Sequence, residues 1–179
     1  MCPLSAETER GRYSEGKDSL RITCEAGFQA YVFDQPLASF SLSGIMTMHG
    51  VGKCGLVLRI DPDSHDGYYI SLDLMKGIAQ MRAWGTGPLH SGEAMMEFKT
   101  IQAGFWYDEG PRDINFQLLA FGSYHELSVN GRVILSLADT TFDYGLVGFY
   151  VETADLQVES LSLVQLEPPT QSDEHLANG

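Results

Sequence analysis

Short apolar runs separated by turn-forming residues constrain the fold of this chain more than any other feature. Between residues 19 and 166, segments rich in Val, Ile, Leu, Phe and Tyr alternate with Gly, Asp, Pro and Asn. No long glycine-free stretch carries the i, i+3, i+4, i+7 apolar stripe of an amphipathic helix. The pattern therefore predicts an all-β fold, a two-sheet antiparallel β-sandwich with very little helix.

The expected strands can be placed individually. Asn130-Gly131 lies between two apolar runs and is typical of a tight hairpin turn in which both central residues adopt positive φ. Residues 1–18 are polar and are expected to form a flexible lead-in to a sandwich domain at 19–167, followed by a flexible tail at 168–179. The strands are expected at 19–26, 29–34, 38–50, 54–61, 66–77, 77–85, 95–103, 114–122, 124–131, 132–139, 145–152 and 156–166.

Charge and hydropathy exclude several classes of protein. The formal net charge is -13, from 24 acidic and 11 basic residues, so a phosphate backbone or an anionic membrane would be repelled. No apolar run reaches the roughly 20 residues of a membrane span, and the first residues contain no signal-peptide core. We therefore expect no nucleic-acid or membrane partner and favour a cytoplasmic location.

The three cysteines show no spacing typical of a disulfide framework or a zinc site. Cys24 and Cys54 are interpreted as small core residues, with a single bridge between them as the alternative. The five histidines are scattered, and His125 is expected to point into the core beside Leu127.

Strand alternation predicts one outward face of unusual composition. Aromatic, arginine and carboxylate side chains recur there at every second position of several strands. Aromatic rings can cover the C–H face of a sugar, and charged planar groups can bind adjacent hydroxyls. The alternative is a set of cross-strand ion pairs, such as Arg82 with Asp73. The candidate ligand-binding residues are Arg59, Tyr69, Asp73, Arg82, Trp84, Tyr124, Glu126, Tyr150 and Glu152.

Two motifs carry a family resemblance. They are G-Y-Y-x-S-L-D at 67–73 and, after the Asn-Gly hairpin and Asp139, G-x-V-G-F-Y-V-E at 145–152. With the flanking strands, they resemble concanavalin A-like jelly-roll domains over roughly residues 19–166. The nearest resemblance is to the C-terminal β-sandwich of glycoside hydrolase family 32 fructosidases and to family 66 carbohydrate-binding modules.

The resemblance implies a module that binds a fructan or related glycan end, or that packs against a glycoside hydrolase catalytic domain or subunit. It implies binding roles for Arg82, Glu126, Glu152 and neighbouring aromatic residues. In the fructosidases the sandwich follows a five-bladed propeller, and the resemblance here covers the sandwich alone. Domains of this type often carry a structural calcium ion, whose site the sequence does not locate; no other cofactor is expected.

Chemical motifs are weak. Hydrolysis of a glycoside needs two carboxyl groups flanking the bond, and no Glu-x-Asp-x-Glu run is present. The segment 61–67 has closely spaced aspartates but departs from the EF-hand pattern, so a hairpin connection is favoured over a calcium loop. Trp106 is expected to cap the sandwich or to form one wall of the sugar site.

Three functions follow, in order of preference. The first is a non-catalytic carbohydrate-binding module that recognises a glycan terminus on one sheet face. The second is a structural or interaction domain whose aromatic face contacts a subunit or partner domain. The third is a jelly-roll glycoside hydrolase using Glu126 and Glu152.

Overall fold

The computed structural model describes residues 1–4, 11–16, 19–85, 99–106 and 113–167, and within them it contains eleven strands and no helix. The sequence predicts breaks between strands at Gly27, at 51–53 and at 153–155. In the structure the strands continue through these positions, which gives three long strands, β3, β4 and β11. The strands are β1 (Cys2–Pro3), β2 (Gly11–Glu15), β3 (Ser19–Val32), β4 (Phe40–Ile60), β5 (Gly67–Asp73), β6 (Ile78–Trp84), β7 (Lys99–Phe105), β8 (Asp113–Phe121), β9 (Tyr124–Val129), β10 (Arg132–Ala138) and β11 (Leu146–Gln165).

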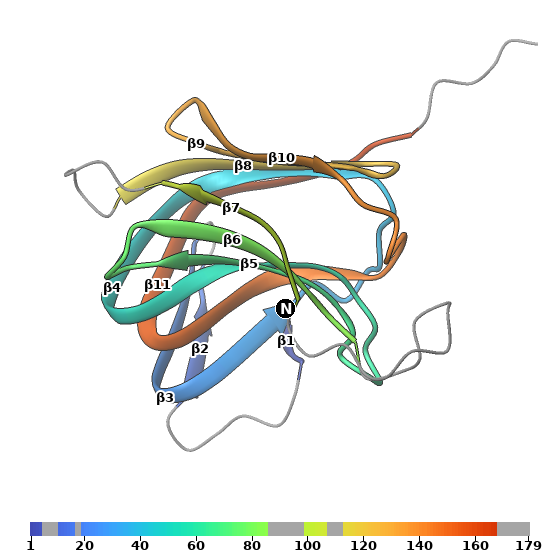
Figure 1. Cartoon of the computed structure of the whole chain (residues 1–179). Helices are drawn as coiled ribbons and strands as arrows, with labels where there is room; N and C mark the ends of the chain where they lie inside the picture. The colour runs from blue at the N-terminus through green and yellow to red at the C-terminus, as the bar shows by residue number, and fades with distance from the viewer. Residues whose placement is uncertain (5–10, 17–18, 86–98, 107–112, 168–179) are drawn as a thin grey trace, which may run out of the picture.

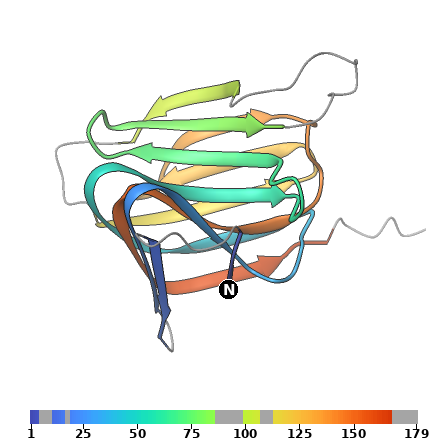
Figure 2. The same ribbon diagram turned by 90° about the horizontal axis from the view of Figure 1, so that it is seen from below.

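The long strands bend and take part in two layers of one curled sheet (Figure 1). The first half of β4 pairs with β8, while its second half pairs with β5. The first layer therefore runs β1-β3-β11-β4-β5-β6-β7, and the second runs β2-β3-β11-β4-β8-β9-β10. Figure 2 shows the same curl from below. The predicted two-sheet antiparallel β-sandwich is confirmed.

Bulges mark the corner where the strands pass from one layer to the other. The register of β11 shifts between Glu152 and Ala154 against both β3 and β4. Thr153 has a φ of 49°, and the neighbouring Gly27 and Gly50 have φ of 76° and 112°. Extra residues and left-handed conformations bend a strand sharply, so these positions turn the sheet upon itself. The corner also places Phe28 beside Glu152, its partner in the ladder.

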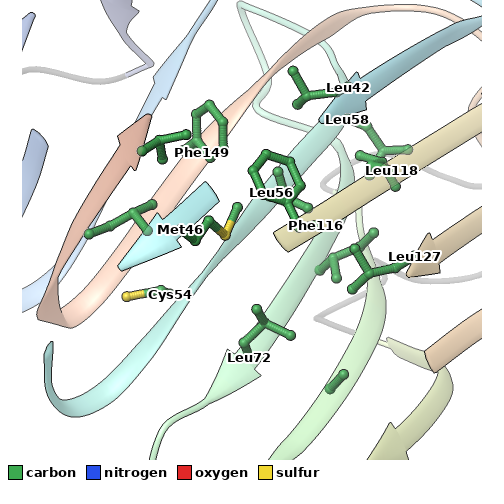
Figure 3. Close-up of a cluster of buried hydrophobic side chains, with 14 of the residues drawn as sticks. Leu42, Met46, Cys54, Leu56, Leu58, Leu72, Phe116, Leu118, Leu127 and Phe149 are labelled. Atoms are coloured by element: carbon green, nitrogen blue, oxygen red, sulfur yellow. The ribbon is translucent and has the colours of Figure 1, made fainter. Parts of the chain in front are cut away.

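A single apolar core fills the space between the layers. Figure 3 shows side chains from β4, β5, β8, β9 and β11 gathered there. A second, smaller buried cluster lies on the outer side of the first layer, and Leu4 and Trp84 pack against it. Its buried members are Ala30, Val32, Val57, Ile60, Tyr69, Leu146 and Tyr150. The first layer therefore has apolar side chains packed on both faces.

The edge strands β7 and β10, one from each layer, are joined by a side chain. Gln102 on β7 accepts a hydrogen bond from Ser136 N at 2.8 Å and donates one to Ser136 O at 3.0 Å. The amide thus takes the place of a neighbouring strand for β10. At Gly104 a Cβ would lie 2.5 Å from the carbonyl oxygen of Ile134, so glycine permits this close approach.

Several local predictions are confirmed. Asn130 and Gly131 have φ of 50° and 76°, as the predicted hairpin turn requires. Cys24 and Cys54 are free, and both lie in the core. His125 is buried at 1% exposure. Trp106 is also buried in the core cluster, which supports the expectation that it caps the sandwich.

The lead-in is more structured than its composition indicated. Cys2–Pro3 and Gly11–Glu15 both pair with β3, so part of the segment 1–18 belongs to the sheet. Polar strands at an edge give little sequence signal because only one neighbour orders them. The predicted tail at 168–179 lies outside the described residues, as does the start of the strand expected at 95–103. Among the described residues, no helix has the length and apolar character needed to cross a membrane.

Candidate functional site

The outer face of the first layer brings most of the predicted binding residues together. Antiparallel register aligns side chains into rows that run across the strands. One row contains Glu152, Lys53 and Asp73, on β11, β4 and β5. The next contains Tyr150, Gly55 and Ser71, and a third pairs Tyr69 with Arg82.

These rows surround a depression of about 310 Å³, which we call the β11–β6 depression. Residues from five strands of the first layer contribute to it, which is possible because the layer is curled and its rows are in register. Its described lining residues are Gly27, Phe28, Lys53, Tyr69, Arg82, Tyr150 and Glu152. Four of the nine candidates, Tyr69, Arg82, Tyr150 and Glu152, therefore converge.

Gly55 allows the Tyr150 ring to lie across β4. A Cβ at this position would be 2.7 Å from Cε1 of Tyr150 and 1.9 Å from the carbonyl oxygen of Ile70. No larger residue fits without moving the ring and the neighbouring strand. The Tyr150 phenol consequently reaches over two strands towards β6, where Arg82 Nη2 donates to its oxygen at 3.4 Å.

The aromatic floor of the depression is rigid and uncharged. The rings of Tyr69 and Tyr150 meet edge to face, with centroids 6.1 Å apart. Tyr69 donates its hydroxyl proton to the carbonyl oxygen of His65 at 2.9 Å. Burial raises the pKa of Tyr150 to about 12 and raises the pKa of Tyr69 as well. Both phenols are therefore neutral at ordinary pH. The contact between the rings and the hydrogen bond of Tyr69 hold the two side chains in place.

The charged rim is formed by an ion pair. Lys53 Nζ lies 3.5 Å from Glu152 Oε1, and these side chains are 27% and 40% exposed. Because both remain accessible to solvent, the pair contributes little to stability and both groups can exchange partners with a ligand. With Arg82, the depression offers two cationic donors and one carboxylate acceptor.

Phe28 and Lys53 were missed by the sequence analysis. Phe28 is 50% exposed at the edge of the depression, which leaves a ring face open to a ligand. The sequence predicts separate strands on either side of Gly27, and the bulge there obscures which face of the sheet Phe28 lies on. Lys53 stands in a glycine-rich segment between two expected strands. The only feature of the sequence that could have indicated Phe28 is its position directly after a glycine.

Asp73 and Trp84 lie beside the depression rather than in it. Asp73 Oδ1 accepts hydrogen bonds from the backbone N–H groups of Met75 and Lys76, at 3.0 and 2.8 Å, and so caps the turn after β5. Trp84 is partly buried against the second cluster. Asp73 therefore stabilises a turn, and Trp84 packs against the apolar cluster that contains Tyr69 and Tyr150.

The expectation that Arg59 points outward is wrong. Two residues of β4, Leu58 and Arg59, oppose a single residue of β11 at this point, and Arg59 has a φ of 55°. This bulge reverses the alternation: Ile60 joins the outer cluster, and Arg59 is 2% exposed. A one-residue irregularity exchanges the two faces for every residue after it.

The buried guanidinium of Arg59 donates hydrogen bonds to three segments that connect strands. Nη1 donates to Phe142 O at 2.7 Å, and Nη2 donates to Ala38 O at 2.9 Å and also to Gly122 O. These acceptors belong to the segments that follow β10, β3 and β8. Arg59 is therefore placed to hold one end of the sandwich together.

Tyr124 and Glu126 do not join the depression. Both lie on β9 in the second layer, where Tyr124 donates its hydroxyl proton to Glu126. The expectation that all nine candidates lie on one outward face is therefore wrong for these two residues as well. Alternation predicts which face of its own strand a residue lies on. It does not predict the layer to which that strand belongs, which the topology of β8–β10 determines.

The described lining does not present the pair of carboxyl groups that a glycosidase uses. Glu152 is the sole carboxylate among those lining residues. The segment 61–67 connects β4 to β5, and Asp61 Oδ1 accepts hydrogen bonds from the backbone of Asp63 and Ser64 at 2.9 and 2.8 Å. The arrangement of the depression suits binding through hydrogen bonds and ring contacts.

Comparison with solved structures identifies proteins that share this architecture. No family model and no curated protein sequence matches the chain. The carbohydrate-binding module CBM66 from Bacillus subtilis is a structural neighbour, with a TM-score of 0.73 and 14% identity over 91% of this chain and 94% of that one. A Bacillus subtilis protein of unknown function with a galectin-like fold has a TM-score of 0.66 and 13% identity, over 87% and 86% of the two chains.

A more distant neighbour is the Caenorhabditis elegans galectin LEC-6, with a TM-score of 0.53 and 10% identity over 90% of this chain and all 100% of that one. At these identities the likeness concerns architecture. The chain therefore has a concanavalin A-like, galectin-like β-sandwich fold.

Proposed function

We propose that this chain is a non-catalytic carbohydrate-binding module that holds a glycan terminus in the β11–β6 depression. The observation that carries the proposal is the convergence of an exposed aromatic ring, two cations and a carboxylate on one hollow of about 310 Å³. That volume suits a small group such as one sugar residue, and the fold is shared with a carbohydrate-binding module.

Each part of the depression has a role in this proposal. Phe28 covers the C–H face of the sugar ring, as an open aromatic face does for an apolar surface. Arg82 donates to sugar hydroxyl groups, and Glu152 accepts from them while Lys53 donates beside it. Tyr69 and Tyr150 form the floor and hold Arg82 in position.

The ligand we propose is a fructosyl end or a related sugar terminus, as the resemblance implies. A hollow of about 310 Å³ has room for one sugar residue, so we propose that it holds the end unit of a glycan. Affinity is expected in the micromolar to millimolar range, since a shallow polar site buries few atoms. A glycoside hydrolase domain or subunit is the partner we propose for such a module.

The test is a panel of sucrose, inulin, levan and β-galactosides against the full chain, followed by calorimetry on any sugar that binds. Arg82→Ala should weaken binding at least tenfold and leave the unfolding transition unchanged. Arg132→Ala, which removes an equal charge from the exposed start of β10, is the matched control. A panel without binding, together with a concentration-dependent dimer, would instead favour an interaction domain.

A further inference from the structure

The second layer carries a separate hollow on its own outer face. It has a volume of about 450 Å³, and the described residues that line it carry no charge. Five of its nine described lining residues carry hydroxyl or amide side chains, and they lie on β4, β8, β9 and β11. Ile45 and Phe116 add apolar surface to the same hollow. The polar lining residues, with the glycine at one end of the hollow, are Ser43, Asn115, Gln117, Ser128, Gly131 and Ser160.

Sheet register explains why these groups gather. Ser43 pairs with Gln117, and Gln117 pairs with Ser128, so three polar side chains from three strands form one row. Ser162 extends the row on β11. Beyond the hairpin turn, no atom lies within 4 Å of a Cβ built at Gly131, so this end is open.

A hydrogen-bonded chain leads from the hollow along β9. Ser128 Oγ donates to Glu126 Oε1 at 3.5 Å, Tyr124 donates to the other oxygen of Glu126, and Tyr124 and Ser136 hydroxyls are 3.0 Å apart. At the far end, Phe121 and Tyr124 are ladder partners and are 39% and 36% exposed. The hollow and this chain of side chains together form a strip along β8 and β9. From Gln117 to Phe121 the strip is about 14 Å long, at ~3.4 Å per residue.

We propose that this strip is a second saccharide-binding site, for a neutral oligosaccharide of more than one residue. In a chain of net charge -13, an uncharged hollow lined with hydroxyl and amide groups suits a neutral ligand with many hydroxyls. The Phe121–Tyr124 pair supplies the aromatic surface that such ligands cover, and Glu126 supplies an acceptor. A site for an anionic ligand would be expected to contain a cationic side chain, and the described lining residues of the hollow include none.

The consequence is bivalence. The β11–β6 depression and this strip lie on the outer faces of opposite layers, with the core between them. One molecule can therefore bind two glycan chains, or two parts of one polymer, and gain apparent affinity from their linkage. In this proposal Tyr124 and Glu126 bind a sugar, as the sequence predicts, but in the second layer and not in the β11–β6 depression.

The test uses the full, isotopically labelled chain and follows backbone amide resonances during titration. The probes are inulin-derived, gluco- and galacto-oligosaccharides. We expect amides of residues 115–119 and 124–128 to shift with at least one probe, and to do so equally in Arg82→Ala. The double variant Gln117→Ala/Ser128→Ala should weaken that response at least tenfold, while Asp113→Asn, on the same face of β8 outside the hollow, should not change it.

The outcomes separate the two proposals. Shifts confined to the amides around Lys53, Arg82 and Glu152 would overturn the second site and leave the first. Shifts at 115–128 that disappear in Arg82→Ala would also overturn it, because the response would then depend on the depression. Shifts confined to 115–128 would support the second site and contradict the first.

Discussion

The guanidinium of Arg82 on β6 and the phenol of Tyr150 on β11 are joined by a hydrogen bond of 3.4 Å that spans the two strands between them. Gly55 beneath the Tyr150 ring makes this contact possible, because any side chain there would collide with the ring. The pair connects residues 68 positions apart in sequence and fixes a cation at the depression.

The first prediction concerns this contact. Tyr150→Phe keeps the ring and removes the hydroxyl that accepts from Arg82, so sugar binding should weaken about fivefold, corresponding to ~1 kcal/mol for one lost hydrogen bond. The measurement is titration calorimetry with the sugar identified by the panel. Tyr13→Phe, which loses a phenol hydroxyl bonded to Glu15 on β2, is the matched control. Unchanged affinity in Tyr150→Phe would show that Arg82 is positioned by other contacts.

The second prediction concerns the exposed ring at the edge. Phe28→Ala should weaken binding about fivefold to tenfold, because a ring face against a sugar contributes roughly 1 kcal/mol beyond its buried area. Stability should change little, since half of the side chain already contacts solvent. Val51→Ala is the control: Val51 is 64% exposed and is not among the described lining residues. Equal affinities for both variants would remove Phe28 from the site.

The third prediction separates structure from binding at Arg59. Arg59→Met leaves the carbonyl groups of Ala38, Gly122 and Phe142 without their buried donor, so the free energy of unfolding should fall by roughly 3 kcal/mol or more. Urea denaturation measures the loss, with exposed Arg132→Met as the control. Where the variant is folded, sugar affinity should equal that of the wild type. A variant of normal stability that no longer binds would restore Arg59 to the binding site.

The fourth prediction is a pH dependence from His125. Burial, followed by the nearby Arg59 charge, lowers the pKa of His125 from 6.5 to about 4. The unfolded chain therefore takes up the proton first. The stabilising effect of keeping His125 neutral is complete above about pH 6.5 and is lost as the pH falls towards 4.

The size of this effect is about 3 kcal/mol at pH 4, at ~1.4 kcal/mol for each unit of pKa difference. Urea denaturation at several pH values measures it, and His125→Gln should lose the slope between pH 4 and 6.5. Asp139, whose pKa is lowered by hydrogen bonds from Tyr68 and Thr141 against the effect of burial, adds a loss only at lower pH. The same slope in wild type and variant would assign it to carboxyl groups.

Sequence alone identified most of the strands between residues 19 and 166 because their signal is local. Apolar residues at every second position and turn residues such as Asn130-Gly131 depend only on the backbone geometry of neighbouring residues. Burial of Leu56, Leu58 and His125 followed from the same alternation. The all-β fold and much of the core were therefore predictable.

Tertiary structure decided which faces form one site. The bulge at Arg59 reversed the alternation after Leu58, and the turn of the chain into β8–β10 carried Tyr124 and Glu126 to the second layer. Phe28 and Lys53 joined Arg82 only because β3, β11, β4, β5 and β6 pair in a particular order and register. Register and bulges depend on long-range pairing and core packing, so no local pattern specifies them.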